Sequence, residues 1–102
     1  MIELTGKQKR YLRSLGQKLQ AVSVIGKAGL TQAVISNLNV LLDRHELVKV
    51  RLPVRDNDER DSLAAELAAA AKASLAGAIG HTALLYRPNP NLSDDKRIVL
   101  PE

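Results

Sequence analysis

AVSVIGKAGLT, residues 21–31, joins the signals of a strand, a glycine turn and a helix start in one continuous stretch. Residues 21–25 are apolar and largely β-branched, which predicts a short strand. Gly26 and Gly29 allow backbone conformations that other residues avoid, and Thr31 is of a type favoured at the N-cap of a helix. Because strands that lead into helices build α/β proteins, the flanking segments are expected to continue this alternation.

The segment before residue 21 predicts an amphipathic helix over Thr5–Leu19. Thr5 followed by Gln8 matches a capping box at the helix start. At 100° per residue, the helix has a leucine stripe and a basic side that faces away from it. The stripe holds Leu12, Leu15 and Leu19, and the opposite side carries Lys9, Arg10 and Arg13, with Lys7 towards its edge.

The segment after residue 31 predicts a helix to about Arg44 and then a strand over Leu47–Val54. Pro53 cannot donate a ladder hydrogen bond, so it should end the regular pairing of this strand. Alternation along the strand separates an apolar face from a basic face. The apolar face holds Val48, Val50 and Leu52, and the basic face holds Lys49 and Arg51.

The second half of the chain predicts a third helix and a β-hairpin. The acidic residues of Asp56–Asp61 suit the first turn of a helix, which continues through the alanine-rich stretch to Lys72. Strands are expected over Ser74–Ile79 and Thr82–Arg87, joined by a tight turn at residues 80–81. The third helix could instead extend to Gly77, and residues 98–100 suggest a short terminal strand.

The predicted order is α-β-α-β-α-β-β, an α/β fold with three helices and a mixed sheet of about four strands. Helical connections favour parallel pairing among the first three strands, and the last two strands form an antiparallel hairpin. A chain of 102 residues has room for one modest core. Residues 1–102 are therefore expected to form a single domain with its core over about residues 2–100.

The positive charge of the chain is concentrated in its first half. Residues 1–55 contain ten lysines and arginines against three acidic residues, a net charge of +7. Residues 56–102 contain five against eight, a net charge of −3. This asymmetry indicates a basic half that faces a polyanion, although a solvated lysine-rich surface is the simpler alternative. No apolar run is long enough to span a bilayer and no signal peptide is evident, so a cytoplasmic protein is expected.

Catalytic and metal-binding signals are weak. The chain has no cysteine, which excludes disulfides and thiolate sites. His45 and His81 have no metal-spaced partner, and helix capping accounts for the acids at Asp56–Asp61. No nucleophile elbow, Walker sequence or zinc pattern occurs. The sequence therefore predicts a non-enzymatic protein without a cofactor.

The turn Gly26-Lys27-Ala28-Gly29 is the strongest binding signal. A strand precedes it and a helix N-terminus follows, where free N–H groups favour an anion. Glycines let the backbone approach a phosphate, and Lys27 adds a charge, although two glycines can also serve a turn alone. With only Tyr11 and Tyr86 as aromatic residues, base stacking is disfavoured and recognition of phosphates and shape is expected.

Five spaced segments together resemble the CRM domain (chloroplast RNA splicing and ribosome maturation), in its bacterial single-domain YhbY-like form. The resemblance covers about residues 1–100 and is specific as a combination. Its segments are LTGKQK (4–9), Leu12 to Leu15, IGKAGLT (25–31), HELVKV (45–50) and LLYRP (84–88). The alanine-rich third helix and Ala76-Gly77-Ala78 depart from the family pattern.

The resemblance implies an RNA-binding fold similar to the C-terminal domain of translation initiation factor three. It also implies association with precursors of the large ribosomal subunit. Family members carry an RNA-contacting GxxG loop where Gly26–Gly29 stands here, beside basic surface on the first helix and at Lys49. The RNA-binding residues expected from the pattern and the resemblance together are Gly26, Lys27, Ala28, Gly29, Thr31, Lys7, Lys9, Arg10, Arg13, Lys49 and Arg51.

The function expected from these features is non-enzymatic binding of structured ribosomal RNA during large-subunit assembly, with no membrane and no small-molecule substrate. Two alternatives remain from the residues themselves. One is a general nucleic-acid binder with DNA as its target, and the other is a protein–protein adaptor that docks acidic partners. An RNA-modifying enzyme is a more distant alternative.

Overall fold

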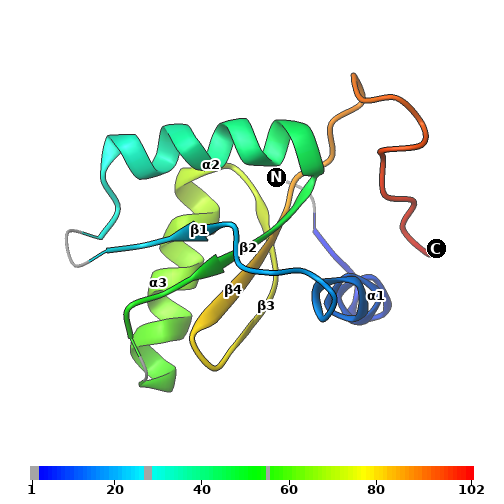
Figure 1. Cartoon of the computed structure of the whole chain (residues 1–102). Helices are drawn as coiled ribbons and strands as arrows, with labels where there is room; N and C mark the ends of the chain where they lie inside the picture. Colours follow the sequence, from blue (N-terminus) through cyan, green and yellow to red (C-terminus); the bar gives the residue numbers. More distant parts are fainter. Residues whose placement is uncertain (1–2, 27–28, 55) are drawn as a thin grey trace.

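The computed structural model describes residues 3–26, 29–54 and 56–102. The predicted element order is confirmed, and the third strand has the predicted bounds. None of the helices in these ranges is both long and apolar enough to cross a bilayer. The elements are α1 (Gly6–Gly16), β1 (Ser23–Val24), α2 (Gln32–His45), β2 (Leu47–Arg51), α3 (Asn57–Ala70), β3 (Ser74–Ile79) and β4 (Thr82–Tyr86) (Figure 1).

The four strands form one mixed sheet in the order β1-β2-β4-β3. β1 pairs in parallel with β2, as predicted, and β3 and β4 form the predicted antiparallel hairpin. The expected pairing of β2 with β3 is wrong, because β4 lies between them and pairs antiparallel with both. The tight turn at Gly80, whose φ is +60°, folds β4 back along β3. The other edge of β4 then remains free to pair with β2.

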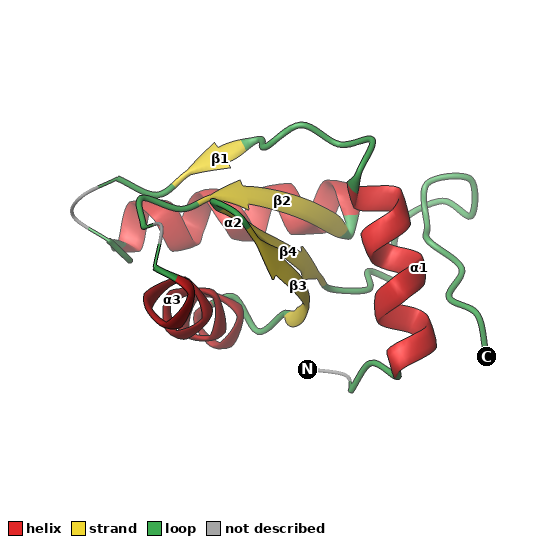
Figure 2. Ribbon diagram, turned by 90° about the horizontal axis from the view of Figure 1, so that it is seen from below, coloured by secondary structure: helices red, strands yellow, loops and turns green. Residues whose placement is uncertain are grey.

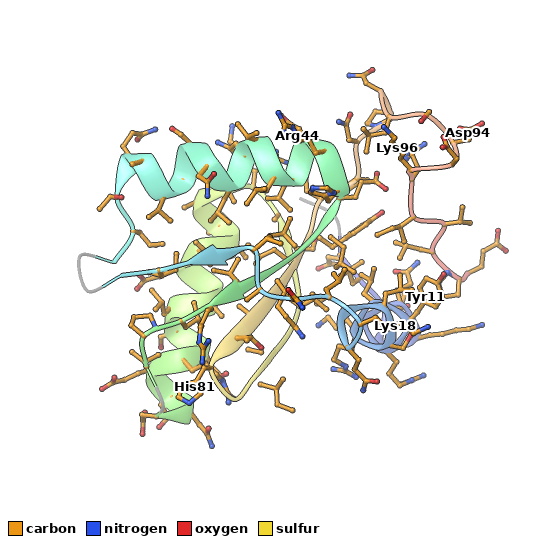
Figure 3. The ribbon with its side chains drawn as sticks, viewed as in Figure 1. Tyr11, Lys18, Arg44, His81, Asp94 and Lys96 are labelled. Atoms are coloured by element: carbon orange, nitrogen blue, oxygen red, sulfur yellow. The ribbon has the colours of Figure 1, made fainter. Side chains whose placement is uncertain are left out.

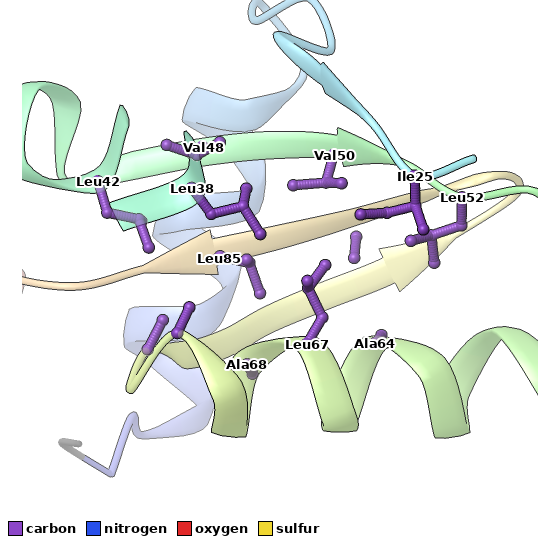
Figure 4. Packing of buried hydrophobic residues seen from close by; sticks show 13 residues of the cluster. Ile25, Leu38, Leu42, Val48, Val50, Leu52, Ala64, Leu67, Ala68 and Leu85 are labelled. Atoms are coloured by element: carbon purple, nitrogen blue, oxygen red, sulfur yellow. The ribbon is translucent and has the colours of Figure 1, made fainter. Parts of the chain in front are cut away.

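Helices cover both faces of the sheet. Figure 2 shows α2 and α3 on one side and α1 on the other. Against α2 and α3 lies the larger core, in which Leu38 and Leu42 of α2 and Leu67 of α3 meet Val50 and Leu85 (Figure 4). Ala64 and Ala68 are also buried here, so the alanine-rich helix packs closely on the sheet.

A smaller core lies under α1 on the opposite face. Leu12 packs there with Leu47, Leu84 and Tyr86, and residues of the C-terminal segment cover it. Gly16 comes close to β4, because a Cβ atom at this position would lie 2.8 Å from a methyl carbon of Leu84. The close contact brings the end of α1 onto the sheet.

Several elements are shorter than predicted. The capping box of Thr5 and Gln8 is present. However, α1 ends at Gly16, because the N–H groups of residues 18 and 19 donate to carbonyls three residues earlier, as in a 3₁₀ turn. Leu19 therefore leaves the leucine stripe and is 38% exposed. β1 is Ser23–Val24, β2 ends at Arg51, β4 ends at Tyr86, and α3 ends at Ala70.

The C-terminal segment is held by a buried carboxylate rather than by a terminal strand. Residues 98–100 form no strand, which corrects that expectation. Glu46 is fully buried, and its carboxylate accepts hydrogen bonds from the backbone N–H of Asn89 at 2.5 Å and of Ile98 at 2.6 Å. Arg97 Nε lies 3.6 Å from the same carboxylate. These contacts fold the segment back over α1, where Ile98 and Leu100 join the smaller core.

Tyr86 should make stability depend on alkaline pH. Burial raises the pKa of the Tyr86 hydroxyl above its usual 10.0 and Glu46 raises it further, whereas Arg97 lowers it. A phenol with a raised pKa contributes its full stabilisation below pH 10 and loses it as the pH rises through the folded-state pKa. Urea unfolding from about pH 9 to 11 should therefore show a shallower loss of stability in Tyr86→Phe than in the wild type. Tyr11→Phe, at an exposed tyrosine, is the control, and equal slopes in all three proteins would contradict the expectation.

Candidate nucleic-acid interface

The basic side chains of β2 lie on the face of the sheet that carries α1. Val48 and Val50 point into the core under α2 and α3, so alternation places Lys49 and Arg51 on the opposite face. Lys49 is half-buried and its amine donates to the carbonyl of Leu19 at 3.2 Å, whereas Arg51 is exposed. The predicted basic face of this strand is therefore present and open.

A small cleft joins Lys49 to α1. The cleft has a volume of about 110 Å³ and is lined by Arg13 of α1, by Gln17 directly after α1, and by Lys49, Gly77 and Thr82 of the sheet, among others. The stem of Arg13 lies directly on Gly77, because a Cβ atom there would be 2.9 Å from Arg13 Cδ. The glycine thus lets an arginine from α1 and a lysine from β2 line one cleft.

The other predicted cations of α1 are exposed but less gathered. Lys9 and Arg10 lie on the outer surface of the helix, away from Leu12, which is buried. Lys7 is also exposed, and its amine donates to the carbonyl oxygen of Glu102 at 3.3 Å. These side chains extend the positive surface outward from the cleft without lining it.

The glycine-framed loop leaves the sheet at the end of β1. The Gly29 N–H donates to the Gly26 carbonyl at 3.0 Å, and Gly29 has a φ of +73°, which requires the freedom of glycine. Thr31 caps α2 by accepting a hydrogen bond from the Val34 N–H at 3.2 Å, so that N–H already has a partner. Lys27 and Ala28, which were predicted to contact RNA, lie outside the described residues.

The loop and α1 occupy opposite ends of β1 (Figures 1 and 2). β1 runs parallel to β2, with Ser23 opposite Val50 and Val24 opposite Arg51, so the loop follows the end of β2 that carries Arg51. The predicted residues therefore do not form one cluster. They form a strip that runs from α1 through Lys49 and Arg51 towards the loop, and we call it the basic strip.

The acidic residues at the start of α3 belong to the other layer. Asp56 caps α3 and accepts a hydrogen bond from the Glu59 N–H at 3.0 Å, as predicted. Asp61 pairs with Arg60 at 3.0 Å. α3 packs on the sheet face opposite α1, and these carboxylates do not line the cleft that holds Arg13 and Lys49.

Neither histidine has a catalytic or metal-binding arrangement. His45 ends α2 and His81 lies in the turn between β3 and β4, as predicted. Within residues 3–26, 29–54 and 56–102, no group of three or more His, Asp or Glu side chains could hold a metal ion.

Two features were missed by the sequence reasoning. One is Glu46, which was counted only as an acidic residue, although a fully buried carboxylate needs partners and holds the C-terminal segment. The other is a hollow of about 530 Å³ lined by Arg44, His45, Leu92 and Lys96. Arg44 and Lys96 lie near the same end of the molecule in Figure 3, and only the fold brings them together, since they are far apart in sequence.

Comparisons with known proteins agree on one family. The model of the CRS1/YhbY (CRM) domain matches residues 4–87. A probable RNA-binding protein of Pseudomonas aeruginosa is 40% identical, with 92% of this chain and 94% of the relative covered. An RNA-binding protein of Haemophilus influenzae is 34% identical, with 99% and 98% covered. The solution structure of a hypothetical protein of Staphylococcus aureus superposes with a TM-score of 0.83 at 35% identity, over 97% of this chain and all of that one. The chain therefore belongs to the CRS1/YhbY (CRM) domain family, a non-enzymatic family of RNA-binding proteins, as the resemblance predicted.

Proposed function

We propose that this protein binds structured ribosomal RNA during assembly of the large ribosomal subunit in the cytoplasm, with residues 1–102 as one RNA-binding unit. The observation that carries RNA binding is the basic strip, in which Arg13 and Lys49 line one cleft and Arg51 lies exposed on the same sheet face. The relatives named as RNA-binding proteins support the same ligand. We also propose that the fold is similar to that of the C-terminal domain of translation initiation factor three, as the family resemblance implies.

The binding mode in this proposal is a grip on phosphates. Lysine and arginine contacts to phosphates release counterions, so the affinity should fall linearly with salt concentration on a logarithmic plot. Few aromatic residues are available for stacking, which favours recognition of the RNA backbone and shape. The exposed cations Lys7, Lys9 and Arg10 would extend the contact beyond the cleft.

The glycine-framed loop is proposed as the far end of the same contact. Gly26 and Gly29 are open to solvent on their Cβ side, with no atom within 4 Å of an added Cβ, so a phosphate could approach the backbone there. Thr31 would act by shaping the helix start, since its hydroxyl already caps Val34. Lys27 and Ala28 enter this proposal from the sequence alone.

Charge reversal at Lys27 tests the loop. Lys27→Glu should weaken binding to ribosomal RNA by about tenfold while the thermal melting temperature stays close to that of the wild type. Lys72→Glu, an equal change of charge at an exposed site that follows α3, is the control. Unaltered RNA affinity of a folded Lys27→Glu protein would remove the loop from the interface.

Crosslinking in cells, followed by sequencing of the bound RNA, tests the assembly role. Enrichment at discrete sites of large-subunit precursors is the expected result, and a featureless profile would contradict it. Equal affinity for duplex DNA and ribosomal RNA at physiological salt would favour a general nucleic-acid binder. Partners that remain bound after ribonuclease treatment would favour a protein adaptor.

A further inference from the structure

A pocket larger than the cleft lies beside the basic strip. Its volume is about 370 Å³, and it opens where α1, the connection to β1, the end of α2 and the C-terminal segment meet. Most of its wall is aliphatic. The aliphatic side chains are Leu15, Leu19, Val22, Leu47 and Ile98.

Two of these side chains are exposed. Leu19 is 38% exposed and Val22 is 54% exposed. The early end of α1 at Gly16 leaves both in the connection to β1 instead of in the core. An apolar hollow with exposed walls in a protein of this size indicates a binding site for an apolar group.

The polar side chains of the pocket favour an anionic ligand. They are Gln20, His45 and Lys49, and no carboxylate lines the pocket among the described residues. Lys49 also lines the cleft that holds Arg13, and its amine bonds to the Leu19 carbonyl. The pocket and the basic strip are therefore continuous at Lys49. A ligand with its apolar part in the pocket would place its charged part on the strip.

We propose that this pocket takes the base of one unpaired nucleotide while the adjoining phosphates lie on the basic strip. This inference rests on the proposed RNA binding. The volume falls within the roughly 300–1,000 Å³ of small-molecule sites, which suits a flat base on aliphatic walls. The pocket would provide a contact to a base even though the protein has few aromatic side chains for stacking. RNA with an unpaired nucleotide would therefore be preferred.

The test compares two RNA hairpins that differ by one unpaired nucleotide. One hairpin carries a single bulged 2-aminopurine, and the other is fully paired. Wild-type protein should bind the bulged hairpin more tightly, and the 2-aminopurine fluorescence should rise, because the base leaves its stack for walls without aromatic rings. Val22→Ser should weaken binding to the bulged hairpin by about threefold, and Leu19→Ser/Val22→Ser by about tenfold.

The matched control is Val40→Ser, because Val40 is 48% exposed on α2 and lines neither the pocket nor the cleft. Net charge is the same in every variant, so the salt dependence and the affinity for the paired hairpin should stay at wild-type values. Equal affinities of the wild type for the two hairpins, with unchanged fluorescence, would overturn the pocket proposal and leave the proposed function standing. Failure to bind either hairpin would overturn both. Equal effects of Val22→Ser and Val40→Ser, or RNA binding that does not change in Val22→Ser, would also overturn the pocket proposal.

Discussion

Glu46→Ala is expected to lower the free energy of unfolding by about 3 kcal/mol, a large part of the stability of a domain of this size. The carboxylate is fully buried and accepts from the N–H groups of Asn89 and Ile98. Its removal leaves two backbone donors without their acceptor, each at a cost of about 1–3 kcal/mol, and takes away the ionic partner that lies 3.6 Å from Arg97 Nε. The loss is limited by the ability of the C-terminal segment to detach and reach water.

Urea unfolding measures the loss, and hydrogen exchange at the amides of Asn89 and Ile98 locates it. Exchange there should accelerate more than exchange in β2, because the released segment opens before the sheet does. Glu46→Gln should be intermediate, since it keeps one acceptor oxygen but turns an amide donor towards another donor. Glu66→Ala, at an exposed glutamate on α3, is the control. A Glu46→Ala protein within about 0.5 kcal/mol of that control would show that the buried carboxylate is not what holds the segment.

The sequence predicted the elements well where local signals were strong. Thr5, Thr31 and Asp56 are capping residues whose hydrogen bonds are complete within four residues. Alternation along β2 correctly separated Val48 and Val50 from Lys49 and Arg51, because the two faces of a strand differ by one residue step. The basic face of the candidate site could therefore be predicted in advance.

Features that depend on distant partners could not be predicted in this way. β4 lies between β2 and β3, with the hairpin turn at Gly80. No local sequence pattern predicts which strand pairs with the second edge of β4. Glu46 resembles any surface glutamate until Asn89 and Ile98 are folded over it. Leu19 matched the helical stripe, but the turn after Gly16 moved it into the wall of a pocket. In each case, tertiary contacts decide between options that the local sequence leaves equal.

Arg13→Glu/Lys49→Glu is expected to weaken RNA binding by about 100-fold at moderate salt, the largest effect on binding that we expect. Both side chains line the cleft between α1 and the sheet. Each reversal removes a solvent-screened contact to a phosphate and adds repulsion, together about 1.4 kcal/mol, which is tenfold in affinity. The slope of log affinity against log salt concentration should become less steep by the amount that corresponds to about two phosphate contacts.

The matched control is Arg44→Glu/Lys72→Glu, at exposed cations of α2 and of the turn after α3. Each double variant lowers the formal net charge from +4 to 0, so attraction of the whole protein to RNA falls equally in both. Circular dichroism melts establish that both variants fold. If the two variants lose affinity to the same extent, then net charge rather than the basic strip governs binding. A much larger loss in Arg13→Glu/Lys49→Glu would instead require that the phosphates meet the molecule at the cleft, because only the positions of the charges distinguish the two proteins.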